Sequence, residues 1–547
     1  MKRSTLSLIY AIALMCSLSA CNRLSLEEEP LSAVSVDQAL HSKSGFEMAI
    51  ISLHQAARDE LTKVDLDLYF DMNIGTDVAT TGQEPAVNFR NYQTYLTPNN
   101  SQLAVYWDWA YQEMIMRANT IIAYAQREEN AALWDQDTEK NRIIAEARFF
   151  RAYAYNLLAN LYGGVPLVDT VYNTPKTDFV RASRSEIYEF AKVDLEYARQ
   201  WLPDLVAADQ EGRIVKAAAD HLLCEINISL GDYEGAIAAA SDVINSGRYQ
   251  LMTERFGLHT SEPGDVYSDL FKTGNQNRSS GNLESIYTWQ FEDQTPGGYG
   301  AGNRGNHNLR GWGPFLVMLK DPKGQTGMIV ADSIGRGVGW VRPTNYFLYD
   351  LWKDDWDTDI RNSPYNIRRV HYYNNPSSSY FGKPVEKRTS LEDTMQNWYP
   401  TIRKIEGQLV YDWASNGSRA GQTVCDFMVF RLAGTYLLRA EAYLKNGDTF
   451  HATEDINQLR KRAKASLINE SQISLDVVLD ERARELIVEE PRRRTLMRMG
   501  KLVERTRAYN IRSSTVNTIQ DYHELWPIPQ TAIDANIGRQ LEQNPGY

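Results

Sequence analysis

The residues that could support catalysis are not arranged for it. The run Gly300-Ala301-Gly302-Asn303-Arg304-Gly305 has the GxGxxG spacing of a dinucleotide-binding loop. That motif binds a pyrophosphate only where it joins a strand to the first turn of a helix. Here Gly311, Gly313 and Pro314 follow soon afterwards, so no helix is expected to begin. We therefore interpret residues 300–305 as a loop without a nucleotide.

Metal-ligating residues and carboxylate pairs give no stronger signal. No two of the eight histidines are four residues apart and no Cys/His cluster occurs, so a transition-metal site is not expected. An acidic group comprises Asp350, Asp354, Asp355, Asp357 and Asp359. Calcium could bind there, but the group lacks the spacing and the glycine of an EF-hand loop, so we interpret it as a solvated loop. We predict no cofactor. A glycosidase needs two facing carboxylates on separate elements, and nothing among the 70 acidic residues selects such a pair.

Residues suited to binding gather in the middle of the chain. Segment 289–312 mixes flat aromatic side chains with forked polar ones, and Trp340 follows shortly. Sugar rings have apolar C–H faces rimmed by hydroxyls, so aromatic platforms beside Asn, Asp or Arg suit them. The candidate ligand-binding residues here are Trp289, Tyr299, Asn303, Arg310, Trp312 and Trp340.

Other tryptophans are expected to have a structural role. Trp107, Trp109, Trp352 and Trp356 lie in or near helical periods, and large aromatic side chains are usually mostly buried. We predict that these four belong to the hydrophobic core.

The clearest element in the sequence is a helix over residues 145–162. Its apolar residues recur at three- and four-residue spacing and therefore share one face: Phe150, Ala154, Leu157, Leu158 and Leu161. Gly163 and Gly164 then end the helix, and Pro166 prevents it from resuming. The helical pattern around this segment extends over about 139–162. Similar patterns predict further helices near 44–62, 103–127, 184–202, 214–230 and 233–246.

Composition divides the chain into three zones. At 547 residues it exceeds the usual size of a single core, so two packed domains or one domain with a large insertion are expected. Segment 257–425 holds 20 of the 34 glycines and 7 of the 12 tryptophans and shows few helical periods. We predict a helical region over 44–256, a loop-rich insertion over 257–425, and helices followed by a tail over 426–547.

An internal repeat links the two helical zones. The pattern around Cys224-Glu225 and Gly231-Asp232 recurs 216 residues later around Ala440-Glu441 and Gly447-Asp448. Each copy predicts a helix, a Gly-Asp turn and a second helix that begins with small residues. Small residues let paired helices approach closely, as in tetratricopeptide-like hairpins.

Charge and cysteine usage limit the partners. The formal net charge of −12 argues against nucleic acid, because phosphate binding needs a cationic surface. Cys224 and Cys425 lie in apolar segments, where thiols are most often core residues. A disulfide between them remains open, because spacing alone never shows one.

The first residues have the form of an export signal. Lys2 and Arg3 precede an apolar run over 6–18, which is too short to span a bilayer, and Leu18-Ser19-Ala20-Cys21 has the form of a lipobox. We predict a signal peptide over 1–20, lipidation of Cys21 and a lipid-anchored linker over 21–43. Several acyl chains would anchor the mature protein stably.

A series of motifs resembles the SusD/RagB family of outer-membrane nutrient-binding lipoproteins. The segment AEARFFRAYAYNLLANLYGGVPLV over 145–168 resembles the family's helix and "LYGGVPL" turn. Further matches, in order along the chain, are Arg117-Ala118-Asn119, Arg342-Pro343-Thr344, Asp359-Ile360-Arg361, the DERAREL run over 480–486, Trp526-Pro527-Ile528-Pro529 and Gln543-Asn544-Pro545-Gly546-Tyr547.

One stretch departs from the family pattern. Glu490-Pro491-Arg492-Arg493-Arg494-Thr495 lacks the aromatic residue and the aspartate that usually follow the arginine-rich helix. The basic run suggests an anion site, but Glu481, Glu485 and Glu489 lie close by in sequence. We therefore predict local ion pairing.

The resemblance implies a mainly α fold with little β-structure, in which tetratricopeptide-like helical pairs cradle a loop-rich ligand region. It implies a protein that is not an enzyme and that captures oligosaccharides at the surface of the outer membrane. A loop that begins at Asp77 would help to line the ligand face. The implied partner is a SusC-like TonB-dependent transporter. Three alternatives stay open: a RagB-like oligopeptide-binding protein, a surface glycosidase and a purely structural scaffold.

Overall fold

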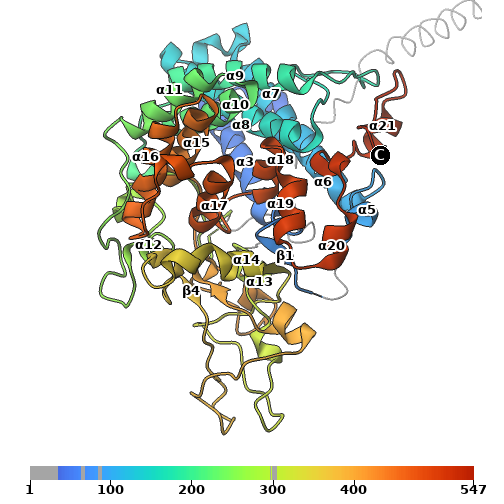
Figure 1. The fold of residues 1–547 in the computed structure, drawn as a ribbon. Helices are drawn as coiled ribbons and strands as arrows, with labels where there is room; N and C mark the ends of the chain where they lie inside the picture. The colour runs from blue at the N-terminus through green and yellow to red at the C-terminus, as the bar shows by residue number, and fades with distance from the viewer. Residues whose placement is uncertain (1–34, 63–67, 84–88, 296, 299–304) are drawn as a thin grey trace, which may run out of the picture.

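The computed structural model describes residues 35–62, 68–83, 89–295, 297, 298 and 305–547. Helices from both ends of the chain form one body, and the segment between them forms a loop-rich part at its lower side (Figure 1). This is the mainly α architecture that the sequence predicts. No helix within the described ranges combines the length and the apolar character that a membrane crossing requires.

The N-terminal half of the body agrees closely with the helical periods. The predicted helices are confirmed, except that the one near 103–127 is interrupted by a π-helical turn, η2. The elements are α2 (Val36–Ala39), α3 (Lys43–Thr62), α4 (Leu68–Asp71), α5 (Tyr92–Tyr95), α6 (Ser101–Asp108), η2 (Trp109–Ile115), α7 (Met116–Ala125), α8 (Asp137–Tyr162), α9 (Arg184–Trp201), α10 (Lys216–Leu230) and α11 (Tyr233–Ile244).

The C-terminal half returns to the same body. Figure 1 shows its helices, in orange and red, beside the blue and green ones. Its elements are α15 (Leu432–Lys445), α16 (Thr449–Arg462), α17 (Leu475–Leu486), α18 (Arg492–Arg498), α19 (Leu502–Tyr509), α20 (Ser513–Thr518) and α21 (Gln530–Ala535).

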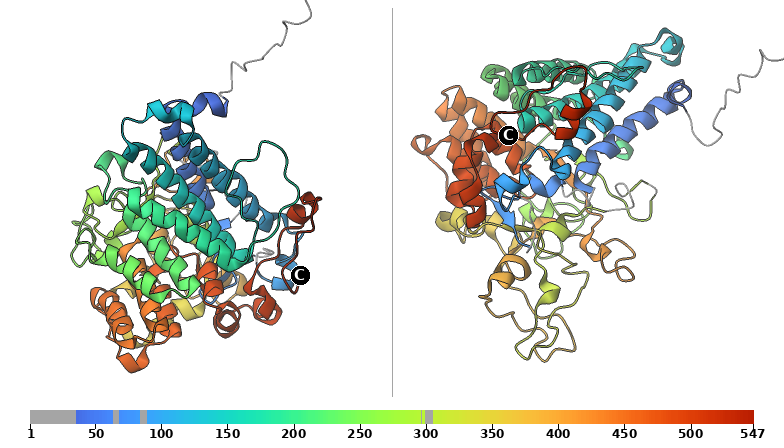
Figure 2. Two further views of the ribbon diagram at one scale, coloured as in Figure 1. Left: turned by 90° about the horizontal axis from the view of Figure 1, so that it is seen from above. Right: turned by 90° about the vertical axis from the view of Figure 1, so that its right-hand side faces the viewer.

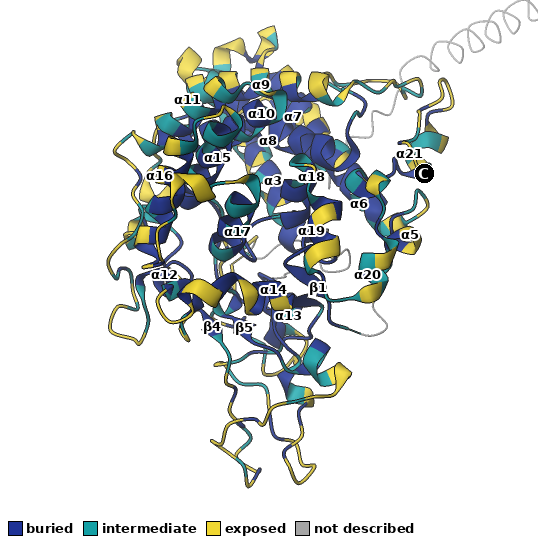
Figure 3. Ribbon diagram, in the orientation of Figure 1, coloured by how far each residue is buried: buried dark blue, intermediate teal, exposed yellow. Residues whose placement is uncertain are grey.

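Helix α8 is the central element of the body. Every residue from Phe149 to Tyr162 is buried, and the burial colours show α8 as dark interior (Figure 3). Gly163 ends the helix with a positive φ of 74°, which costs glycine little. Arg151 on α8 donates two hydrogen bonds, of 2.7 and 2.8 Å, to Asp194 on α9. This buried bidentate pair fixes the two helices against each other.

The internal repeat is a pair of similar helical hairpins. In α10–α11 the turn is made by Gly231 at φ +79°, and the Asp232 side chain accepts a hydrogen bond from the first turn of α11. In α15–α16, Gly447 and Asp448 do the same. The hairpins pack together through α11 and α15, and the views in Figure 2 show the stacked helices. The repeat predicted from the sequence is therefore confirmed.

The loop-rich part has only short regular elements. Three two-stranded antiparallel sheets pair β1 with β3, β2 with β6 and β4 with β5. In the first sheet Ala79 lies opposite Pro343, so the N-terminal region is tied directly to the middle of the chain. The elements are β1 (Ala79–Thr81), α12 (Val266–Asp269), β2 (Ser285–Trp289), α13 (Asn308–Trp312), β3 (Val341–Pro343), α14 (Asn345–Leu348), η7 (Asp350–Asp355), η8 (Ile360–Asn362), β4 (Ile367–Arg368), β5 (Thr401–Ile402) and β6 (Phe427–Arg431).

Two loops of this part extend away from the body and form the lower end of the molecule in Figure 1. This lobe, residues 316–334 and 370–398, has a small hydrophobic core of its own, formed by Leu316, Leu319, Met328, Tyr373 and Val385.

A buried ion network joins the loop-rich part to the helices. Glu485 on α17 receives hydrogen bonds from Arg361 (2.9 Å), Arg431 (2.7 Å) and Arg462. All four side chains are at most 1% exposed. Burial alone would raise the pKa of Glu485, but Arg462, Arg431 and Arg361 hold that pKa well below its ordinary value. Glu485 is therefore a buried carboxylate that stays ionised.

The ion pairing predicted for the glutamates of α17 is confirmed, but it is only partly local. Arg484 pairs with Glu481 at 3.1 Å, three residues away. Arg361 and Arg431 belong to other elements and were not predicted as partners. Long-range pairing leaves no periodic trace in a sequence, so the sequence could not reveal it.

We predict that Glu485→Gln lowers the free energy of unfolding by about 3–5 kcal/mol, because it leaves buried arginines without a counter-charge. Chemical denaturation followed by circular dichroism measures this loss. Glu454→Gln on the exposed side of α16 serves as the control and is expected to change stability by less than about 0.5 kcal/mol. Equal stability of the two variants would contradict the structural role of the network.

Candidate functional site

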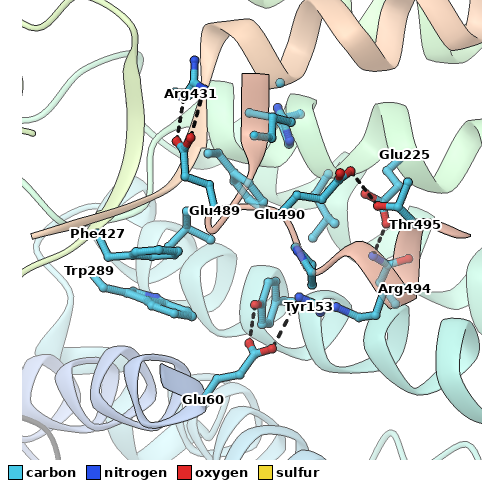
Figure 4. Close-up of a pocket in the computed structure, with 18 of the residues that line it drawn as sticks. Glu60, Tyr153, Glu225, Trp289, Phe427, Arg431, Glu489, Glu490, Arg494 and Thr495 are labelled. Carbon is cyan, nitrogen blue, oxygen red and sulfur yellow. Dashed lines mark hydrogen bonds and ion pairs between the residues drawn. The ribbon is translucent and has the colours of Figure 1, made fainter. Parts of the chain in front are cut away.

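A small cavity lies where the two halves of the chain meet. It is lined by residues of α3, α8, α10, β2, β6 and the segment before α18 (Figure 4). Glu60 accepts a hydrogen bond of 2.7 Å from the hydroxyl of Tyr153, and Arg494 lies 3.4 Å from its other oxygen. On the opposite side Arg431 donates to Glu489 at 2.6 Å. The cavity has a polar lining, and Arg431 in its wall also belongs to the buried ion network.

The size of this cavity excludes a sugar ligand. It has a volume of about 90 Å³. Ligand pockets are commonly about 300–1,000 Å³, whereas one water takes up about 30 Å³. His221 in its wall is buried, and burial lowers its pKa to about 4, so the imidazole is neutral near pH 7. The cavity is suited to a few ordered waters that complete the hydrogen bonds of buried polar groups.

Trp289, a predicted ligand-binding residue, lines this cavity and is 3% exposed. Its ring stacks on Phe427 with centroids 5.6 Å apart, as Figure 4 shows, and its Nε1 donates to the hydroxyl of Tyr287. Because β2 is paired with β6 and covered by helices, the side chain has no surface for a ligand. The prediction of a binding role for Trp289 is wrong.

Asp77 is also buried rather than part of a ligand-lining loop. Arg492 donates to its two oxygens at 3.0 and 2.7 Å, and Arg505 donates to Oδ2 at 2.7 Å. Burial opposes ionisation of Asp77, but Arg492 and Arg505 together hold its pKa below the ordinary value. The residue anchors β1 to the C-terminal helices, which corrects the expectation that it contacts ligand.

Trp312 is 1% exposed and belongs to the core at the end of α13. Its carbonyl oxygen accepts a hydrogen bond of 3.0 Å from Tyr399. The expectation that Trp312 forms a sugar platform is therefore corrected. Tyr299 and Asn303 lie outside the described residues, and so does Cys21.

Arg310 and Trp340 are the two predicted residues that the structure brings together at the surface. Both are half-buried, and the Arg310 guanidinium lies 5.0 Å from the centre of the Trp340 ring. The Trp340 ring also contacts the ring of Phe70, with centroids 5.8 Å apart. Arg310 also donates to the carbonyl oxygen of Ser418 at 3.2 Å. This contact holds the loop 410–419 against the pair.

The same loop carries two aromatic residues that sequence reasoning missed. Tyr411 is 73% exposed and Trp413 is half-buried. We call Arg310 and Trp340, with the adjoining loop 410–419, the Trp340 surface. The run YDWASNGSRAG over 411–421 has aromatic residues among turn-forming ones, and that alternation is the signal that could have located it. Gly305 lies against Val410 and Thr423, close to the start and the end of this run.

Three of the four tryptophans predicted to belong to the core are buried. Trp107, Trp109 and Trp352 are buried, as predicted. Trp356 is 40% exposed, so its assignment to the core is wrong. It follows a short 3₁₀-helix, η7, where the helical spacing used for the prediction does not apply.

The acidic group near η7 is partly neutralised by arginines. Asp355 receives a hydrogen bond of 2.8 Å from Arg460, and Asp359 receives one of 2.7 Å from Arg361. Within the described ranges no three His, Cys, Asp or Glu side chains gather as metal ligands would. Cys224 and Cys425 are both buried free thiols.

A larger apolar groove of about 620 Å³ lies on the helical body. Its lining includes the aromatic residues Trp107, Tyr111, Tyr172 and Phe179 and residues of α21. Sequence reasoning missed this groove, because its walls come from three segments that are distant along the chain.

Two family models match opposite ends of the chain. One, described as "SusD family", matches residues 341–547, and the other, described as "Starch-binding associating with outer membrane", matches residues 26–227. The chain belongs to the SusD-like family. The resemblance seen in the sequence motifs is therefore confirmed.

Relatives of this SusD-like protein extend over most of its length. The SusD-like protein P2 of Formosa agariphila is 26% identical over 500 residues, 88% of this chain and 86% of that protein. The starch-binding protein SusD of Bacteroides thetaiotaomicron is 26% identical over 453 residues, 75% of this chain and 74% of that one. Surface glycan-binding protein A from Bacteroides thetaiotaomicron, solved in complex with laminarihexaose, has a TM-score of 0.68 at 20% identity and covers 92% of this chain and 99% of its own. This last likeness shows a common fold.

Burial predicts losses of different size for two tryptophans of this SusD-like protein. Trp312→Ala leaves a core cavity and is expected to cost about 3–5 kcal/mol of unfolding free energy. Trp340→Ala removes a half-exposed ring and is expected to cost about 1 kcal/mol. Denaturant titration of both variants measures the difference. Equal losses would show that Trp340 is a core residue and would remove it from the candidate surface.

Proposed function

We propose that this SusD-like protein is a cell-surface lipoprotein that captures oligosaccharides and delivers them, uncleaved, to a SusC-like TonB-dependent transporter in the outer membrane. The Trp340 surface is the observation that carries the proposal. It places the Trp340 ring beside the Arg310 guanidinium, next to a loop that carries the exposed Tyr411. Aromatic faces suit the C–H faces of sugar rings, and Arg310 is a fork-shaped donor for hydroxyls.

The chemistry of this surface is suited to capture and release. Half-exposed rings give many small contacts rather than an enclosed pocket, and a ligand held this way dissociates readily. The transfer step needs a ligand that can leave, so moderate affinity supports the role. Binding of this kind needs no cofactor and breaks no bond. The protein is therefore proposed not to be an enzyme.

The relatives support a carbohydrate ligand. One relative is named a starch-binding protein, and one protein of the same fold is named a surface glycan-binding protein and was solved with laminarihexaose. The description of one family model refers to association with the outer membrane. The lipobox that ends at Cys21 supplies a matching anchor in the sequence, with the protein facing the cell surface.

We predict that purified wild-type protein is retained in native gels that contain laminarin or amylopectin. Trp340→Ala and Arg310→Ala are each expected to weaken binding about tenfold, because a stacking ring and a charged hydrogen-bond donor are lost. Affinity electrophoresis across a polysaccharide and mucin-glycan panel measures the retention.

A matched control is available on the helical body. Phe450 on α16 is 56% exposed, so Phe450→Ala removes an exposed ring without touching the Trp340 surface. It is expected to bind like the wild type. Release of reducing ends by the wild type would favour a surface glycosidase instead. Binding of oligopeptides without glycan binding would favour a RagB-like peptide protein, and binding of neither ligand nor transporter would favour a scaffold.

The anchor is tested separately. Cells that express the wild type with a labelled fatty acid are expected to yield a labelled protein in the outer-membrane fraction. Cys21→Ala removes the thiol that would be acylated and is expected to abolish the label. A variant that remains labelled, or a wild type found unlabelled in the cytosol, would contradict lipidation at Cys21.

A further inference from the structure

Two exposed aromatic rings flank the 3₁₀-helix η7. Tyr349 is 39% exposed and Trp356 is 40% exposed. Their rings are nearly parallel, at 11°, with centroids 6.5 Å apart. Large rings are usually mostly buried, so two of them exposed together and aligned form an unusual surface.

Contacts with Arg369 and Asn362 hold Trp356 in place. The Arg369 guanidinium lies 4.5 Å from the centre of the Trp356 ring and covers one face. Arg369 is itself fixed by hydrogen bonds to the carbonyl oxygen of Leu348 (2.8 Å) and to Oδ1 of Asn362 (2.6 Å). The Asn362 side chain donates to the carbonyl oxygen of Trp356 at 2.6 Å. The exposed surface of Trp356 is therefore available to a ligand without further ordering, which lowers the entropic cost of binding.

Neighbouring buried groups anchor the helix that carries the rings. Trp352, which lies between Tyr349 and Trp356 in the sequence, is 1% exposed. Its Nε1 donates to the carbonyl oxygen of Phe347 at 2.6 Å. Arg484 on α17 donates to the carbonyl oxygen of Leu351 at 3.0 and 2.9 Å. The two exposed rings thus stand on a turn that is fixed to the helical body.

Polar groups lie along the same helix. Lys353 and Asp350 form an ion pair of 2.7 Å at the surface. In a 3₁₀-helix, residues three apart lie one above the other, so Asp350 and Lys353 share one ridge, and Trp356 follows the helix directly. Flat rings bordered by charged donors and acceptors are the combination that sugar hydroxyls and C–H faces require.

We propose that Tyr349 and Trp356 form a second carbohydrate-binding platform, with Asp350 and Lys353 as its polar rim. This inference rests on the proposed function, from which it takes oligosaccharides as the ligand class. The Tyr349–Trp356 platform and the Trp340 surface come from the two ends of one short segment, 340–356. A polysaccharide bound at both sites is held more tightly than at either alone, because the second contact becomes intramolecular.

The spacing of the rings disfavours a proline-rich peptide. Aromatic grooves that bind such peptides take prolines between their walls. A ring inserted between two others needs about 7–8 Å, twice the contact distance of about 3.5–4 Å. The centroids of Tyr349 and Trp356 are 6.5 Å apart, so a proline ring does not fit between them. Successive pyranose rings of an oligosaccharide need no such slot, because they contact the exposed parts of the two rings.

The test compares variants of the two surfaces in affinity gels that contain laminarin or amylopectin, and in calorimetry with laminarihexaose. Trp356→Ala and Tyr349→Ala are each expected to weaken polysaccharide binding about three- to tenfold. Trp356→Phe keeps a flat ring and is expected to retain most of the affinity. Combining Trp356→Ala with Trp340→Ala is expected to weaken binding more than either change alone.

Phe381→Ala is the matched control, because Phe381 is 57% exposed on the lobe and outside both surfaces. Thermal unfolding of every variant checks that the fold is intact. Wild-type retention by Trp356→Ala and Tyr349→Ala, while Trp340→Ala is impaired, overturns the platform and leaves the proposed function standing. A wild type that no polysaccharide retains overturns both. Displacement of laminarin from the platform by a proline-rich peptide also overturns the assignment to sugars.

Discussion

Burial of charge at Glu485 is the constraint on which the arrangement of the loop-rich part depends. A carboxylate removed from water is stable only if its neighbours replace the lost solvation. Arg361, Arg431 and Arg462 do so, and they come from η8, β6 and α16. Asp77 plays a similar part for β1. Since these contacts are directional, they orient segments that have almost no sheet to orient them.

The sequence allowed the helical body to be predicted well, because periodicity and turn chemistry are local properties. The stripe on α8, the glycine after it and the repeated Gly-Asp turns all describe which face is buried and where a helix ends. The ion network was only partly predicted. Glu481 has one partner three residues away, but its bond to Arg361 crosses 120 residues. Such pairs depend on the tertiary structure and leave no pattern in the chain.

The candidate site was harder to predict for the same reason. Trp312 and Trp340 lie in similar glycine-rich sequence, yet one is packed under Tyr399 and the other stands half-exposed beside Arg310. Residue type shows that an aromatic ring is available for binding, but only the packing of distant loops decides whether it faces solvent. Trp356 shows the opposite error, because a short 3₁₀-helix imitates helical spacing without burying the residue. The family resemblance identified the fold, but it did not show which of these tryptophan side chains are buried and which are exposed.

The distribution of the ion network along the chain has a consequence for biogenesis. Its arginines begin at Arg361. Glu284 and Asp359 are early partners of these arginines, but Glu481, Glu485 and Glu489 lie near the end of the polypeptide. During vectorial synthesis or export, the network therefore stays incomplete until α17 and the segment after it have been made. Contacts of such long sequence separation slow folding. A truncated chain that ends before α17 would have an unassembled central part, so release of a competent protein depends on completion of its C-terminal helices.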